Sequence, residues 1–527
     1  MFTDDNTQSF PIPMSLEPMI PEGDLVRIVN DTIDRLSERF WDPQPSSAGR
    51  PAYPPQTMTK IVIYAYAREW YSARVIEQAL RENLRMVWLA GGRTPNFRTI
   101  NRFRSQQMQE RITPLFHHVV QELLEEQLIT GDHYFLDGTK IEADANRYTF
   151  VWRKSTVRYE QRLQERLAEL WQEVVPFLSL PDGQERIDAD TLRTVAIQMA
   201  GRQQEAEQRK TEAASSNERR EAQATLRWWR KRHRQIERNY LPRLVKYERY
   251  LATFDGRNSF SKTDPDATFM RMKDDHMGNG QLKPGYNIQM GTENQYIVGY
   301  TVHPNPTDTR CLPPHLTMLH ERPLPFPGQI IADAGYGSEP NYLTLIEEAI
   351  PFLIPYPRMR QEQTRAFQRA IHPVQNWTYD EKDDLYWCPN HRKVPFQAYE
   401  RRTDRYGYQR DLKRYESEDC SECPLKPQCT TAEGNRQVRI NPVYEEGKAI
   451  ARRALTSDEG ASTYARRKIE AESVFGHLKA NRRFRRFALR GTAKVTTEFG
   501  LLAVAHNLRK KAESTKKEAG ETSPASA

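Results

Sequence analysis

Apolar segments with the two-residue periodicity of β-strands, widely separated along the chain, most constrain how this protein can fold. The first, HYFLDGTKIEADA, begins near Tyr134. Further strand signals lie at 285–293, 295–302, 329–337 and 351–358. Between the last two, SEPNYLTLIEEAI has the pattern of a helix. This succession of strands and helices predicts a mixed α/β sheet.

A long charged segment interrupts these strand signals. Residues 155–254 are dominated by Glu, Arg, Gln and Lys, with sparse Leu, Trp and Val. Such a composition favours long charged helices that pack as a hairpin. We therefore expect a helical insertion within the α/β core.

The segment before the first strand is helical in pattern. Residues 56–130 contain short amphipathic stretches, with Ser72 as a candidate N-cap. Short helices joined by a tight turn are typical of a helix-turn-helix, and Arg98, Arg102 and Arg104 lie where a docking helix could meet DNA. A helical bundle with solvated arginines is the alternative interpretation.

These patterns divide the chain into consecutive parts. We predict a flexible leading segment (1–55) with one short helix at about 23–40, an all-helical N-terminal domain (56–130), an α/β core (131–154 and 255–358), a helical insertion (155–254), a Cys-containing insertion (359–445), C-terminal helices of the core (446–511) and a disordered tail (512–527).

Composition bounds the class of protein. Of the 527 residues 38% are hydrophobic, and no stretch approaches the roughly 20 apolar residues of a membrane span. The N-terminus has acidic residues where a signal peptide would be basic, so a cytoplasmic location is expected. The net charge of +8 favours a polyanionic partner, although charge alone is weak support.

Two aspartates occupy positions suited to metal chemistry. Asp137 lies within the first strand, and Asp333 ends the apolar strand IIAD just before Ala-Gly-Tyr-Gly. Mg²⁺ prefers oxygen ligands, and two such ions about 3.5–4 Å apart can assist phosphodiester cleavage. A site of this kind needs acids from different elements that meet at one edge of a sheet.

The third acid is inferred from helix geometry. In the helix predicted over 461–481, the buried stripe is formed by Ala471, Val474, Phe475 and Leu478. Glu472 flanks this stripe, with Lys468 and Lys479 on the same side, whereas Glu470 falls on the opposite flank beside His477. One acid between two lysines fits a metal ligand beside phosphate-binding cations. An exposed, salt-bridged helix is the alternative.

A basic run follows this helix. From Arg466 to Arg490 there are nine Lys or Arg and two Glu, including NRRFRRFALRG with Phe between the arginines. Such a run suits a phosphate backbone. The expected DNA-binding residues here are Lys468, Lys479, Arg482, Arg483, Arg485, Arg486 and Arg490.

Three strings, YFLDGTKIEADANRYTFVWRKS, IIADAGYGSEPNY and EAESVFGHLKANRRFRRFALRG, resemble in order and spacing the acid-bearing segments of DDE transposases from bacterial insertion sequences. The likeness extends to YPPQTMTKIVIYAYAREWYSARVIEQALREN and covers roughly residues 50–511. It implies a ribonuclease H-like core, two Mg²⁺ (or Mn²⁺) ions and DNA strand transfer, with Asp137, Asp333 and Glu472 as the metal-binding catalytic triad. A homodimer on double-stranded DNA, bound at terminal inverted repeats and target, is expected with it.

One part of the resemblance departs from the family pattern. The family helix has Tyr, Arg, Glu and Lys, and the spacing of Glu472 and Lys479 matches it. Lys468 stands where Arg is expected, and Tyr464 is one place out of register. The roles of these two positions are therefore open at the level of sequence.

Four of the five cysteines cluster in the segment 359–445. Cys420 and Cys423 form a two-residue-spaced pair, Cys429 follows, and Cys388 lies upstream. Four thiolates fit a structural zinc site that could stabilise a poorly cored insertion, with His391 as an alternative ligand and free reduced thiols as the alternative state. The remote Cys311 is expected to be a small buried apolar residue.

The leading hypothesis is a transposase that cleaves phosphodiester bonds at the ends of an insertion sequence and joins the freed 3′-hydroxyl to target DNA. A metal-dependent nuclease without strand transfer is the alternative enzyme. An inactive DNA-binding relic that acts as a repressor is the alternative from another class, and the intact carboxylates disfavour it.

Overall fold

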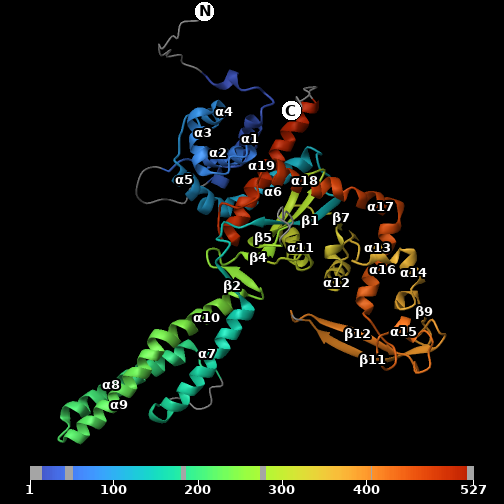
Figure 1. The fold of residues 1–527 in the computed structure, drawn as a ribbon. Helices are drawn as coiled ribbons and strands as arrows, with labels where there is room; N and C mark the ends of the chain where they lie inside the picture. The colour runs from blue at the N-terminus through green and yellow to red at the C-terminus, as the bar shows by residue number, and fades with distance from the viewer. Residues whose placement is uncertain (1–14, 42–51, 180–185, 273–279, 405, 519–527) are drawn as a thin grey trace, which may run out of the picture. The chain divides into compact units, whose positions relative to one another are not determined.

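A computed structural model of the protein describes residues 15–41, 52–179, 186–272, 280–404 and 406–518. The chain divides into two compact units. Unit 1 comprises residues 1–144, 272–276 and 286–527, and unit 2 comprises residues 145–271 and 277–285. Figure 1 shows the helices and strands of both units.

A mixed sheet forms the centre of unit 1. The strands β5 (Leu282–Glu293), β1 (His133–Glu142), β7 (Gln329–Ala332) and β8 (Phe352–Leu353) lie in that order, and β6 (Tyr296–His303) pairs with β5. The first residues of β5 also pair with β4 (Thr268–Arg271). β5 and β6 are antiparallel, whereas β1, β7 and β8 are parallel neighbours. Helices α11 (Leu312–Glu321) and α12 (Glu339–Glu347) connect the later strands, as expected for parallel strands that need crossovers.

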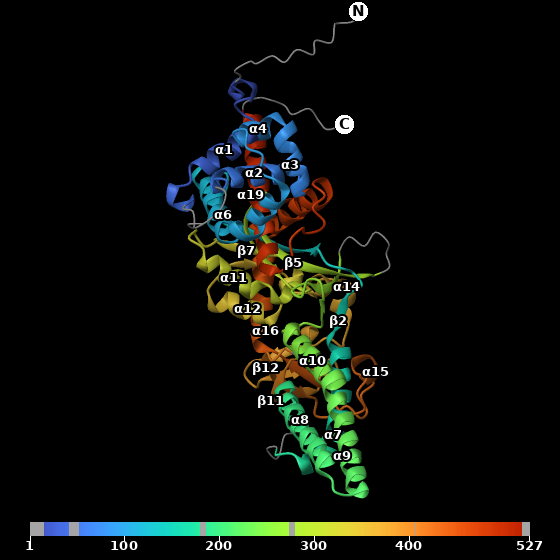
Figure 2. The ribbon, with the colours of Figure 1, turned by 90° about the vertical axis from the view of Figure 1, so that its left-hand side faces the viewer.

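The N-terminal helices pack on the C-terminal helix. They are α1 (Leu25–Asp34), α2 (Pro55–Ala67), α3 (Ala73–Glu82), α4 (Leu84–Leu89), α5 (Phe97–Arg102), a π-helical turn (Phe103–Gln107) and α6 (Met108–Glu125). The long helix α19 (Thr492–Glu518) lies against α1, α2, α6 and β6 (Figure 2). These N-terminal helices therefore share one compact unit with the sheet instead of forming a separate body.

A second, antiparallel sheet forms the Cys-containing segment. Its order is β13 (Gln437–Ile440), β12 (Gln409–Glu416), β11 (Lys393–Thr403), β10 (Leu385–Trp387) and β9 (Thr378–Asp380). Short helices accompany it at Met359–Glu362 (α13), Arg365–Arg369 (α14) and Lys426–Cys429 (α15). Helix α16 (Pro442–Thr456) then leads back to the core, followed by α17 (Asp458–Ala465).

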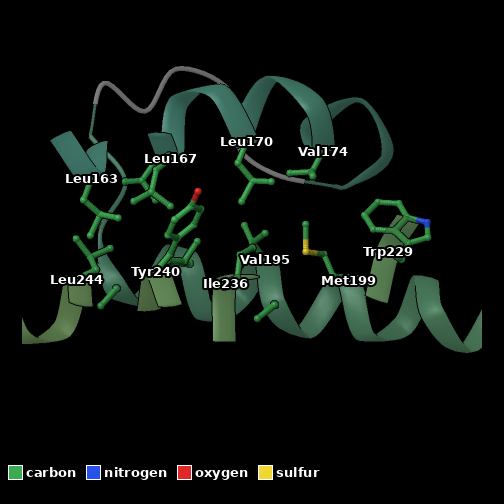
Figure 3. Packing of buried hydrophobic residues seen from close by; sticks show 14 residues of the cluster. Leu163, Leu167, Leu170, Val174, Val195, Met199, Trp229, Ile236, Tyr240 and Leu244 are labelled. Carbon is green, nitrogen blue, oxygen red and sulfur yellow. The ribbon is translucent and has the colours of Figure 1, made fainter. Parts of the chain in front are cut away.

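Unit 2 is built from the long charged helices. They are α7 (Arg153–Val174), α8 (Ala189–Glu212), α9 (Ser216–Gln235) and α10 (Leu241–Phe254), with a π-helical turn (Ile236–Tyr240) between the last two. An apolar seam joins these helices, with leucines of α7 facing α8 and the α9–α10 segment (Figure 3). Short strands β2 (Phe150–Trp152), β3 (Ser259–Ser261) and β4 (Thr268–Arg271) complete the unit.

The structure confirms a mixed α/β protein with a helical N-terminal part. It corrects two element boundaries. The helix expected over 461–481 is broken into α17, a π-helical segment (Lys468–Glu472), α18 (Ser473–Gly476) and a second π-helical segment (His477–Asn481). Residues 512–518, predicted to be disordered, continue α19, and 519–527 lie outside the described residues. No described helix is long and apolar enough to cross a membrane.

Candidate active site

Asp137 and Asp333 stand at neighbouring positions of parallel strands. The β1–β7 register pairs Leu136 with Ala332, so the residues that follow them lie side by side where β7 ends. Neighbouring strands are about 4.8 Å apart, and in-register side chains point to the same face. Asp137 is buried, and Asp333 caps a short 3₁₀ turn by accepting a 2.8 Å hydrogen bond from the Gly335 amide. The sheet register thus brings together two acids that are far apart in the sequence.

Both aspartates line one cavity with the predicted third acid. This cavity, of about 430 Å³, lies in unit 1. Its walls are formed by Asp137, Thr139, Asp333, Arg467, Glu472, Phe475, Gly476, Lys479, Ala480 and Arg485. Three carboxylates and three cationic side chains therefore share one water-accessible space.

A buried polar network supports the loop that carries Asp333. Tyr336, in the turn after Asp333, donates a hydrogen bond to the side-chain oxygen of Gln289 on β5. The Gln289 amide in turn donates to the Asp308 carboxylate at 2.9 Å. Gly138, next to Asp137, lies so close to Asp308 that an added Cβ would stand 2.2 Å from its carboxylate oxygen. This network fixes the turn beside the two aspartates.

Arg467 holds Glu472 through the π-helical segment. Its guanidinium lies 2.9 Å from Glu472 Oε1 and 3.8 Å from Asp137 Oδ2. In a regular α-helix, residues five apart are separated by about 140° around the axis and cannot meet. A π-helical turn has i to i+5 bonding, so it places Arg467 directly beside Glu472.

This geometry explains the register departure seen in the sequence. The π-helical segment accommodates one extra residue, so Tyr464 and Arg467 keep their mutual spacing of three while both shift by one relative to Glu472. The Arg467 side chain is only 14% exposed, and the centre of the Tyr464 ring lies 6.0 Å from its guanidinium carbon. Lys468, predicted to flank Glu472 toward DNA, is exposed and does not line the cavity. Sequence reasoning missed Arg467 because it assumed uniform α-helical spacing.

The cavity residues are electrically coupled. Burial acts to lower the pKa of Arg467, but the charges of Tyr464 and of the acids Asp137, Glu472 and Asp333 outweigh it and raise that pKa. Arg467 therefore stays protonated among the three carboxylates. Glu470, in contrast, is buried outside the cavity, where it accepts a 2.7 Å hydrogen bond from the Gln295 amide.

The three carboxylates surround the cavity without forming a ready-made ion site. Within the ranges that the structure describes, no three His, Cys, Asp or Glu side chains are arranged so that they could hold a metal ion as they stand. Here Glu472, about half exposed, is paired with Arg467 instead. The chemistry of the donor set is nonetheless that of a hard divalent cation, because every acid offers oxygen ligands.

Two family models match the chain, one toward each end. A model described as a transposase DDE domain matches residues 387–512, which include Glu472, and one described as a transposase domain matches residues 14–106. The two matches support a DDE-type transposase of the insertion-sequence kind. No curated protein sequence that was searched matches it.

The basic run of this transposase alternates buried rings with exposed cations. Phe484 and Phe487 are buried and pack against each other with ring centroids 5.4 Å apart. The exposed arginines of the run are Arg483, Arg485, Arg486 and Arg490. Two of them, Arg486 and Arg490, are anchored on Asp144 at 2.9 and 2.8 Å. The phenylalanines therefore hold the run on the core while the guanidinium groups face outward.

Two predicted DNA-binding arginines are buried instead. Arg104 is 3% exposed and donates to Tyr66 Oη and to the Tyr71 carbonyl. Arg482 is 7% exposed, and burial lowers its pKa to about 10. These placements correct the expectation that both side chains face DNA. Arg98 and Arg102 are exposed on α5, as a contact with DNA would require.

Two helix boundaries in the N-terminal part lie at residues that are typical of such positions. α3 begins directly after Ser72, although the serine side chain makes no capping hydrogen bond. Gly91 and Gly92 both adopt positive φ angles after α4, a backbone conformation that favours glycine. The two glycines therefore separate α4 from the segment that leads to α5.

The four clustered cysteines line a second, much smaller cavity. Cys388, Cys420, Cys423 and Cys429 all contribute to a space of about 20 Å³. Backbone amides point at two of the sulfurs, from Arg392 to Cys388 Sγ at 3.4 Å and from Arg436 to Cys420 Sγ at 3.5 Å. All five cysteines of the chain are free thiols here. Cys311 is fully buried away from this cluster and donates to the Thr307 carbonyl, as expected for a small core residue.

Proposed function

We propose that this transposase cleaves phosphodiester bonds at the ends of its own element and joins the freed 3′-hydroxyl to target DNA. The observation that carries the proposal is the convergence of Asp137, Asp333 and Glu472 on one cavity from β1, the end of β7 and the π-helical segment. The order β6-β5-β1-β7-β8, with its first acid on the central strand, also supports a ribonuclease H-like core.

The three carboxylates would hold divalent metal, Mg²⁺ or Mn²⁺. When bound, a pair of such ions activates the attacking oxygen and stabilises the leaving one. In the structure Arg467 forms an ion pair with Glu472 and also faces Asp137. Its positive charge therefore offsets the mutual repulsion of the three carboxylates. The Glu472 side chain is about half exposed, so it has room to turn. On metal binding it would leave Arg467 and contact the ion instead.

Cationic side chains at the cavity are suited to position the substrate. Lys479 and Arg485 line the same space as the acids. Arg483, Arg486 and Arg490 of the same basic run are also exposed. Because Lys and Arg contacts to phosphate fix the register of a duplex without reading its sequence, these residues would align the scissile strand at the acids.

The decisive assay uses a labelled duplex that carries the element's own end. We expect strand cleavage at the end and joining to a second duplex, both of which require Mg²⁺ or Mn²⁺ and stop with EDTA. Cleavage without any joined product would favour the nuclease. End-specific binding with neither product would favour the relic, and metal-independent cleavage would contradict the role given to the carboxylates.

We also propose that the four clustered cysteines hold one structural zinc ion. The four cysteines are among the residues that line one cavity of about 20 Å³, and amide donors face the sulfurs of Cys388 and Cys420. Burial raises the pKa of Cys429, and the nearby Cys388, Cys420 and Cys423 raise it further, because neighbouring thiolates repel one another. A bound cation would offset that repulsion and favour the thiolates.

A further inference from the structure

A row of cations on the helical unit has no assigned role. In the segment 216–254 there are eleven Lys or Arg and only four Asp or Glu, whereas the whole chain has a net charge of +8. Much of the positive excess is therefore concentrated on α9, the following π-helical turn and α10. This segment lies outside the residues matched by the transposase family models.

Five of these cations share one face of the α9 segment. At 100° per residue the four cations on α9 fall within an arc of about 60°, the fifth lies in the π-helical turn that follows, and all five are exposed. They are Arg220, Arg227, Lys231, Arg234 and Arg238. From first to last they span about 27 Å at 1.5 Å per residue. We call this row the α9 stripe.

The α9 stripe points away from the core of unit 2. Trp229 and Ile236 of the same segment lie on the opposite side of the helix and pack in the apolar seam (Figure 3), and Leu226 is also buried. The carboxylates Glu218, Glu221 and Glu237 also fall at other helical angles. The stripe is therefore a cationic surface, and the opposite side of the same helix is apolar.

Two other arginines of α9 form ion pairs with neighbouring helices of unit 2. Arg230 pairs with Glu207 of α8, and Arg232 pairs with Glu173 of α7 at 2.7 Å while its guanidinium lies 4.0 Å from the centre of the Trp228 ring. These contacts hold the helices together. No stripe residue forms an ion pair with a carboxylate in the described part of the chain. Stability of the helical unit accounts for the paired arginines but gives no reason for the stripe.

We propose that the α9 stripe binds the phosphate backbone of duplex DNA without reading its sequence. A rigid line of exposed cations about 27 Å long matches about eight base pairs at 3.4 Å per pair. The inference rests on the proposed function, because the DNA is the transposase's own substrate. It adds a second contact region, separate from the basic run beside the triad.

The test compares two triple variants of the full chain that lose equal charge. In the stripe variant, Arg227, Lys231 and Arg234 are changed to Gln, a good helix former. In the control, Gln replaces three exposed arginines that are paired with Asp190, Glu205 and Asp411, namely Arg193, Arg202 and Arg401. A third variant combines Arg227→Lys with Arg234→Lys and keeps the positive charge of the stripe.

Binding to a duplex of unrelated sequence is measured by anisotropy over a salt titration. The slope of log K against log salt should become shallower by about 2.7 in the stripe variant, at about 0.9 per lost phosphate contact. The control and the Lys variant should keep the wild-type slope. Equal slopes in stripe variant and control would overturn the proposal. So would an unchanged slope with a loss of dimers in sedimentation, since the stripe would then be a protein interface.

Failure of this inference is separable from failure of the proposed function. At low salt, with all protein bound to an element-end duplex, the stripe variant should cut at the wild-type rate, because its triad is intact. If wild type cuts and joins DNA but the slopes do not differ, only the stripe proposal falls. If wild type cuts nothing while the slopes differ, the stripe proposal stands and the catalytic one falls.

Discussion

Asp137→Asn should lower the rate of DNA cleavage by about 10³-fold, because loss of one ligand of a metal pair removes several kcal/mol of transition-state stabilisation. The side chain is buried against Arg467, and the amide is nearly isosteric with the carboxylate. Folding should therefore persist. Because the change removes both the repulsion from the other two acids and the attraction to Arg467, the melting temperature should stay close to that of wild type.

The matched control is Asp132→Asn, five residues earlier and exposed just before β1. It should cut at the wild-type rate. The prediction is tested by measuring the cleavage rate on a labelled duplex and the melting temperature of both variants. A folded Asp137→Asn protein that cuts DNA normally would show that this carboxylate takes no part in the chemistry.

Removal of zinc should unfold the Cys-containing sheet. Its buried cluster, among the described residues, consists of Trp377, Val394, Tyr415 and Val438, a small core for five strands. Domains with so little buried apolar surface usually need a metal or disulfides. Structural zinc in peptides supplies about 10 kcal/mol or more, so Cys423→Ser should abolish both zinc and local protection.

Metal analysis of protein purified without chelator should find one zinc per chain in wild type and in the control Cys311→Ala, whose thiol lies apart from the cluster. Hydrogen exchange of β9 to β13 should rise on Cys423→Ser or on treatment with a strong chelator. Zinc-free wild-type protein with a fully protected sheet would leave the cysteines as ordinary reduced thiols.

The positions of the two aspartates on strands could be predicted because short apolar strands have a recognisable sequence pattern. HYFLDGTK and QIIAD each have an acid at a strand position that can face the sheet edge, and parallel pairing then aligns them. The third acid was also recognisable, since the apolar stripe at Ala471, Val474 and Leu478 orients that segment. Local periodicity placed the three acids on their strands and helix, and the resemblance to the transposase family joined them into one set.

Other features depend on contacts that periodicity cannot reveal. Arg104 appeared solvated because its partner Tyr66 belongs to a buried network with Glu498, 432 residues from Tyr66 along the chain. The pairing of Arg467 with Glu472 depends on a π-helical turn, which has no distinct pattern of apolar residues. Likewise, the union of the N-terminal helices with α19 is a long-range packing that local sequence does not encode.

The most direct test of the account compares Glu472→Gln with wild type on a labelled, pre-cleaved element end. The amide keeps the size and hydrogen-bonding capacity of the side chain but removes the charge that would help to hold metal. We predict that Glu472→Gln binds the end as wild type does and joins it to target DNA at a rate lower by about 10³-fold in Mg²⁺. Joining at the wild-type rate would contradict the assignment of Asp137, Asp333 and Glu472 as the catalytic triad.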